Sequence, residues 1–196
     1  MWRGANRFIR GSFMKSILFL IGYRGTGKTT VGQLLAEKIG WDFVDADVHL
    51  ESLCKRSIKE IFDSEGETGF RERESQNLCE LSKRERCVIA TGGGIILREE
   101  NRTILRENGF VVWLSADPNT IAGRLENDPT TSGRRPNLTL AGGLAEIEQL
   151  IRDREPLYRL CADFKIATSE TSPDVLAQTI LKAWESSIQS TSRSSG

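Results

Sequence analysis

The sequence is poor in the residues that build disulfide frameworks and metal centres. A single histidine, His49, and four cysteines occur among 196 residues, and no two cysteines form a CxxC pair. We therefore expect neither a structural zinc site nor a disulfide scaffold, and the four thiols suit a reducing cytoplasm.

Charge of one sign and long apolar runs are also missing. The 27 basic residues balance 27 acidic ones, so the formal net charge at pH 7 is zero. This balance argues against a nucleic acid or an anionic membrane held by bulk charge. No apolar stretch approaches the roughly 20 residues that span a bilayer. We expect no nucleic-acid partner and no membrane.

The two ends of the chain have the composition of extensions to a single domain. The first 14 residues carry three arginines ahead of the apolar run 17–21. That run is too short for a signal peptide and no small-residue cleavage site follows it, while Met14 offers an alternative start. The end of the chain is rich in serine. We expect one domain over 15–185 and flexible extensions at 1–14 and 186–196.

Between these ends, apolar runs alternate with helical patterns. Strands are expected at 16–22, 41–47, 87–90, 110–114 and 164–168. Helices are expected at 29–40, 57–62, 69–84, 98–109, 117–127, 144–161 with a break near Pro156, and from Ser172 onward. Strands that are apolar throughout predict an α/β fold whose parallel sheet is covered on both faces. In such a sheet the ligand lies beyond the carboxyl ends of the strands.

The segment GYRGTGKTT, residues 22–30, matches G-x-x-x-x-G-K-[ST] and lies between an expected strand and an expected helix. That context favours an ATP phosphate loop over an ordinary glycine-rich turn, because backbone N–H groups and the helix dipole attract phosphate oxygens. Lys28 would reach the β- and γ-phosphates, and the Thr29 hydroxyl would bind Mg²⁺. The expected nucleotide-binding residues are Gly25, Thr26, Gly27, Lys28, Thr29 and Thr30.

The strand at 87–90 is followed by three glycines, Gly92, Gly93 and Gly94, and not by the aspartate that would hold magnesium. The nearest acids are Asp45 and Asp47, which would share one face of a continuing strand. One could bind or orient magnesium, and the other could accept a proton from an attacking hydroxyl. Alternatively, the two acids cap the next helix. The glycines provide either a backbone that approaches a ligand closely or a tight turn.

Two arginines occur in apolar surroundings. Arg154 falls on the apolar stripe of its helix, where a guanidinium needs an anion unless it reaches solvent or pairs with a protein acid. Arg71 follows Phe70 and borders an apolar face, with a helix ion pair to Glu74 as the alternative. Two forked donors and an acid indicate a small substrate with a carboxylate and hydroxyls.

The polar connection at about 126–143 is long and contains two prolines and three glycines, which is typical of a lid. Arg134 and Arg135 lie within it. Arg135, which Pro136 holds extended, could contact the transferred phosphate; the alternative is a solvated loop charge.

In chain order, the segments GYRGTGKTT, DADVHLE, FRERE, GGG, RRPNL and REPLY resemble the shikimate kinase family over residues 15–183. The resemblance implies transfer of the γ-phosphoryl group of ATP to the 3-hydroxyl of shikimate. It further implies a monomer with a three-layer P-loop kinase fold, a five-stranded parallel sheet ordered 2-3-1-4-5 and a mobile lid.

The resemblance also implies roles for individual residues. Asp47 would bind the acceptor hydroxyl and serve as base, Asp45 would be the acid beside magnesium, and Gly93 would donate an N–H group to shikimate. The carboxylate clamp would be Arg71 with Arg154, and Arg135 would contact ATP phosphate. The chain departs from the family in a longer segment between Arg124 and Arg135, in the turn TSETSP, which lacks an arginine for adenine, and in residues 1–13.

Two other functions stay open at this point. One is a kinase for gluconate or another small metabolite on the same scaffold, and the other is a non-catalytic ATP-binding module. The joint presence of Lys28, Asp47 and Arg154 favours an enzyme.

Overall fold

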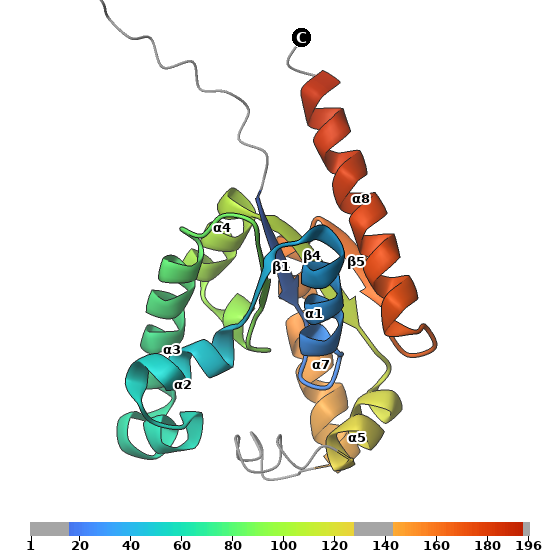
Figure 1. The fold of residues 1–196 in the computed structure, drawn as a ribbon. Helices are drawn as coiled ribbons and strands as arrows, with labels where there is room; N and C mark the ends of the chain where they lie inside the picture. Colours follow the sequence, from blue (N-terminus) through green and yellow to red (C-terminus); the bar gives the residue numbers. More distant parts are fainter. Residues whose placement is uncertain (1–15, 128–142, 194–196) are drawn as a thin grey trace, which may run out of the picture.

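The computed structural model describes residues 16–127 and 143–193. Five parallel strands form one sheet in the order β2-β3-β1-β4-β5, which confirms the expected topology (Figure 1). The strands are β1 (Ile17–Ile21), β2 (Asp42–Asp45), β3 (Cys87–Ala90), β4 (Phe110–Ser115) and β5 (Phe164–Ala167).

Helices connect the strands and cover both faces of the sheet (Figure 1). They are α1 (Lys28–Ile39), α2 (Ala46–Cys54), α3 (Ile58–Leu81), the short 3₁₀ helix η1 (Ile95–Leu97), α4 (Glu99–Asn108), α5 (Pro118–Glu126), α7 (Gly143–Cys161) and α8 (Pro173–Arg193). Among the described residues, no helix is both long and apolar enough to cross a membrane.

Strand β1 lies at the centre of the sheet and is buried on both sides. Leu18 and Leu20 pack in the core layer formed with α1 and α8. Ile17, Phe19 and Ile21 belong to the layer formed with α3, α4 and α7. Because side chains alternate along a strand, one uninterrupted apolar run fills both layers.

Two predicted helix starts are present in full. Ser57 and Glu60 form a capping box: the Glu60 N–H donates to Ser57 Oγ at 3.2 Å, and the Ser57 N–H donates to Glu60 Oε2 at 2.7 Å. At the start of α5, the Thr120 N–H donates to the carboxylate of Asp117 at 2.8 Å, with Pro118 in the first turn. These caps fix where the chain turns back towards the sheet.

The expected break near Pro156 is wrong, because α7 runs from Gly143 to Cys161 through the proline. A proline inside a helix removes one N–H bond. Here buried residues on both sides of Pro156, including Ile147 and Tyr158, hold the two halves of α7 against the rest of the protein.

Helix α8 also extends further than composition suggested, since it includes residues 186–193 of the segment assigned to a flexible extension. The Ser186 hydroxyl donates to Lys182 O at 2.8 Å, and the Ser187 hydroxyl donates to Trp184 O at 2.6 Å. Serines bonded in this way remain compatible with a helix. Trp184 also packs edge-on against Trp41 beside α1, with ring centroids 5.0 Å apart.

Candidate active site

A cavity of about 860 Å³ lies beyond the carboxyl ends of the strands, at the edge of the sheet where the ligand was expected. The phosphate loop, the start of α1, the end of β2, helix α2 and helix α5 form its walls. The predicted site residues that line it are Gly25, Gly27, Lys28, Thr29, Thr30, Asp45, Asp47 and Gly93.

The phosphate loop ends at Gly27, which begins α1 in the left-handed conformation. The Lys28 ammonium donates to the carbonyl oxygens of Gly22 at 2.9 Å and Tyr23 at 2.8 Å, so the lysine folds over its own loop. Thr26 is buried, and its hydroxyl also donates to Tyr23 O, at 2.8 Å. Its side chain therefore supports the loop and does not line the cavity.

Asp45 connects β2 with the phosphate loop. Its Oδ2 accepts a hydrogen bond from the Thr29 hydroxyl at 2.8 Å. Its Oδ1 accepts from the N–H groups of Asp47 at 3.1 Å and Val48 at 3.3 Å, which makes Asp45 the N-cap of α2. The cap and the link to the phosphate loop are therefore both present. A hydroxyl beside a carboxylate suits Mg²⁺, which also keeps waters and binds substrate phosphates.

Asp47 lies in the first turn of α2, because β2 ends at Asp45. The expectation that both acids lie on a continuing strand is wrong in this detail, since the cap at Asp45 starts the helix. Asp47 still lines the cavity, as does His49 of the same helix. Asn77 of α3 fixes this region: its amide donates to Ala46 O at 2.9 Å, and its Oδ1 lies 2.6 Å from His49 Nδ1.

Arg71 lies on α3 with 8 % of its surface exposed. It donates to Glu74 Oε2 at 2.7 Å and to Glu67 Oε1 at 3.2 Å, so the ion pair kept as the alternative is present. The same guanidinium lies against the glycine turn, because a Cβ on Gly94 would come within 2.4 Å of Arg71 Nη1. Gly94 thus leaves the room that the guanidinium occupies.

Arg154 reaches the same turn from α7. Its Nη1 donates to Gly93 O at 3.4 Å, and the Tyr158 hydroxyl donates to the same oxygen at 2.6 Å. Tyr158 stacks on Trp113 of β4 with ring centroids 5.6 Å apart. Burial raises the pKa of Tyr158, and Arg154 opposes that shift. The phenol therefore stays protonated and remains a donor at neutral pH.

The two predicted clamp arginines therefore converge on one backbone turn from different helices. Arg71 contacts Gly94, and Arg154 bonds to Gly93, whose backbone lines the cavity. Gly93 lines the cavity, whereas Arg71 and Arg154 are not among the residues that line it. A guanidinium group is a suitable partner for a small anion bound beside this turn. Arg134 and Arg135, and most of the expected lid, lie outside the described residues.

Several residues at the cavity were missed by reading the sequence. Arg124 lines it and donates to Gly25 O at 3.1 Å and Thr168 O at 2.6 Å, which joins the phosphate loop to the end of β5. Arg24 also lines it, with Nη2 3.9 Å from the Glu146 carboxylate on α7. Arg124 lies in the last turn of α5. Its position directly before the expected lid is the one feature of the sequence that points to a place at the cavity.

Known proteins resemble this chain over most of its length. A family model described as shikimate kinase matches residues 24–185. A shikimate kinase from Rhodopirellula baltica is 47 % identical over 171 residues, which cover 87 % of this chain and 91 % of that protein. The structure of a shikimate kinase from Acinetobacter baumannii in complex with shikimate is 38 % identical, with a TM-score of 0.82 over 88 % of this chain and 94 % of that one.

A gluconokinase from Sinorhizobium meliloti shares the fold, with a TM-score of 0.65 over 93 % of this chain and 99 % of that one. At a sequence identity of 16 %, this similarity shows a shared fold and says nothing about the reaction.

Proposed function

The chain belongs to the shikimate kinase family, and from this premise we propose that it transfers the γ-phosphoryl group of ATP to the 3-hydroxyl of shikimate. The products are ADP and shikimate 3-phosphate, an intermediate towards chorismate and the aromatic amino acids. We propose that the enzyme acts as a monomer in the cytoplasm and that residues 15–185 form its single domain.

The observation that carries the proposal is the meeting of three parts around one cavity. These parts are the phosphate loop, the acids at the end of β2 and Gly93, whose glycine turn is contacted by the guanidinium groups of Arg71 and Arg154. Phosphoryl transfer relies on positioning and charge neutralisation, which such a set supplies.

On the nucleotide side, the N–H groups at the start of α1 and the Lys28 ammonium would hold the phosphates. Thr29 and Asp45 would hold Mg²⁺, which when bound neutralises phosphate charge and orients the γ-phosphoryl group. The 2.8 Å bond between these two side chains supports a shared role. Arg135, outside the described residues, would approach the same phosphate.

On the acceptor side, Arg71 and Arg154 would hold the shikimate carboxylate and the Gly93 N–H would fix the ring. Asp47 would bind the 3-hydroxyl and accept its proton as the oxygen attacks the γ-phosphorus and the bond to the ADP oxygen breaks. The convergence of both arginines on Gly93 and Gly94 supports these roles.

The test is ADP release by the purified chain with ATP and Mg²⁺, given shikimate, gluconate or no acceptor. We expect turnover with shikimate alone, and the variant Lys28→Ala serves as a blank for contaminating kinases. Turnover with gluconate would assign the chain to another small-metabolite reaction on this scaffold. ATP binding without turnover on either acceptor would instead favour a regulatory module.

A further inference from the structure

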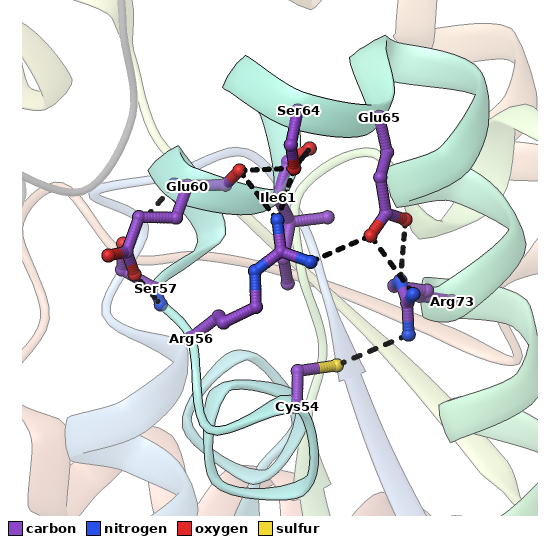
Figure 2. Close-up of polar contacts among 8 residues, drawn as sticks. All are labelled: Cys54, Arg56, Ser57, Glu60, Ile61, Ser64, Glu65 and Arg73. Atoms are coloured by element: carbon purple, nitrogen blue, oxygen red, sulfur yellow. Dashed lines mark hydrogen bonds and ion pairs between the residues drawn. The ribbon is translucent and has the colours of Figure 1, made fainter.

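Away from the cavity, one carboxylate joins three segments of the chain. Glu65 Oε1 accepts from Arg56 Nη1 at 2.9 Å and from Arg73 Nη2 at 3.0 Å, while Glu65 Oε2 accepts from Arg73 Nε at 2.6 Å (Figure 2). Arg73 also lies 3.7 Å from the sulfur of Cys54 at the end of α2. We refer to Arg56, Glu65 and Arg73 as the Glu65 network.

The Glu65 network spans a bend in α3. Gly66 has φ 68° and ψ −174° inside this helix, so α3 consists of two helical pieces that meet there. This combination of angles is open to glycine and costly for other residues. Glu65 ends the first piece and Arg73 belongs to the second, so their two-pronged contact bridges the bend. Because two N–H groups of Arg73 bind the same carboxylate, the contact also fixes the relative orientation of the two side chains.

Arg56 attaches the connection after α2 to the first piece of α3. Besides Glu65, it donates to Glu60 O at 3.0 Å and to the Ser64 hydroxyl (Figure 2). The Arg73 hydrogen bond lowers the pKa of Glu65. The carboxylate therefore remains charged, and its fork intact, throughout the neutral range.

Helices α2 and α3 are thus joined at both ends of α2. Asn77 holds the beginning, through Ala46 and His49. The Glu65 network holds the end. Asp47 lies on α2 near the first tie, and Arg71 lies on α3 two residues before Arg73. The separation of Asp47 and Arg71 therefore depends on how the two helices are held.

We propose that Glu65 is a positioning residue for the phosphoryl acceptor. Its carboxylate fixes the bend at Gly66 and the position of α2 against α3, and these together set the distance between Asp47 and Arg71. This inference rests on the proposed function, because these two residues are taken to hold opposite ends of shikimate. The side chains of Glu65, Arg56 and Arg73 are 25 %, 37 % and 39 % exposed. Ion pairs as exposed as these contribute little to the free energy of unfolding. We therefore assign the Glu65 network to positioning the two helices and not to stabilising the fold.

The first test is Glu65→Gln, which keeps the size of the side chain and removes the charge that holds both arginines. We expect the KM for shikimate to rise about fivefold, the scale of coupling between residues in one network, while the KM for ATP stays within about twofold. Arg73→Lys, which loses the fork but keeps the charge, should move the shikimate KM in the same direction. Glu72→Gln on the exposed side of α3 is the matched control and should change neither constant.

A double-mutant cycle separates positioning from general loosening. If Glu65 acts through Arg71, Glu65→Gln should add less than about twofold to the shikimate KM of an Arg71→Lys background. An unchanged shikimate KM in Glu65→Gln, an equal rise in the KM for ATP, the same rise in Glu72→Gln, or full additivity in the cycle would each overturn the inference. Failure of the unaltered chain to phosphorylate shikimate would instead overturn the proposed function, and the inference with it.

Discussion

The hydrogen bond from Tyr158 to Gly93 leads to a prediction whose size can be worked out. Tyr158→Phe removes one buried hydroxyl, keeps the ring stacked on Trp113, and leaves Gly93 O with the 3.4 Å contact to Arg154. Removing one partner of a buried hydrogen bond costs about 1–3 kcal/mol. Because Arg154 stays in reach of the carbonyl, we expect about 1–2 kcal/mol.

For a domain of this size, 1 kcal/mol corresponds to about 2–4 °C in melting temperature. The melting temperature of Tyr158→Phe should therefore be about 2–8 °C lower. The shikimate KM should also rise, because the turn that carries Gly93 is less firmly held, whereas ATP affinity should persist. Differential scanning calorimetry and initial-rate kinetics give the two readouts.

The other tyrosine provides a matched control. The hydroxyl of Tyr23 is buried, and among the described residues it has no hydrogen-bond partner. Removing a buried hydroxyl without a partner should leave the melting temperature unchanged or raise it. A loss below about 1 °C in Tyr158→Phe, or an equal loss in Tyr23→Phe, would refute the reasoning.

The stability difference should also depend on pH in one direction. Burial raises the pKa of Tyr158 above the value of about 10 that a tyrosine has in an unfolded chain. Well below pH 10 the phenol is neutral in both states, so the full difference between wild type and Tyr158→Phe is present. As pH rises further, the unfolded chain ionises first, wild type loses stability, and the difference should shrink.

Substitutions at three further residues test the assigned roles. Asp45→Asn and Asp45→Ala should both raise the Mg²⁺ concentration needed for half-maximal activity. Only Asp45→Ala should lose the α2 cap, which should lower the free energy of unfolding by about 1 kcal/mol. Equal melting temperatures for the two variants would contradict the cap. Asp47→Asn should lower kcat by about 10²–10⁴ with ATP affinity nearly intact, and a matching loss of nucleotide binding in calorimetry would remove Asp47 from the acceptor site. Arg154→Lys should raise the shikimate KM about tenfold, since a point charge cannot replace a fork; an unchanged KM would show that Arg154 only supports the glycine turn.

The fold, and the meeting of several candidate site residues at one cavity, could be predicted because strong local signals coincided. Apolar strands end in glycines, acids or a phosphate loop, and in a parallel sheet those ends meet at one edge. That rule predicts that Lys28, Asp45 and Gly93 lie close together, and all three line the cavity.

The predictions that are wrong, and the residues that the sequence did not indicate, depend on contacts between distant segments. The period-two argument put Asp45 and Asp47 on one strand face, but the two N–H groups that Asp45 caps start a helix there. The ring of Pro156 marks a helix break in sequence, while burial of α7 on both sides overrides it. The gap between the helices expected at 57–62 and 69–84 contains the bend at Gly66, but the carboxylate that bridges the bend is recognisable only in three dimensions.

The stack of Trp113 on Tyr158 has an optical consequence. Trp113 is buried, lies 5.6 Å from a ring whose hydroxyl holds Gly93, and has the ammonium of Lys165 4.0 Å from its own ring centre. Indole emission responds to nearby charge and to ring contacts, so we expect the fluorescence of Trp113 to respond to changes at the glycine turn, including binding of the proposed acceptor there. Trp41 and Trp184 pack in the opposite core layer with α1 and α8, so their emission should serve as an internal reference.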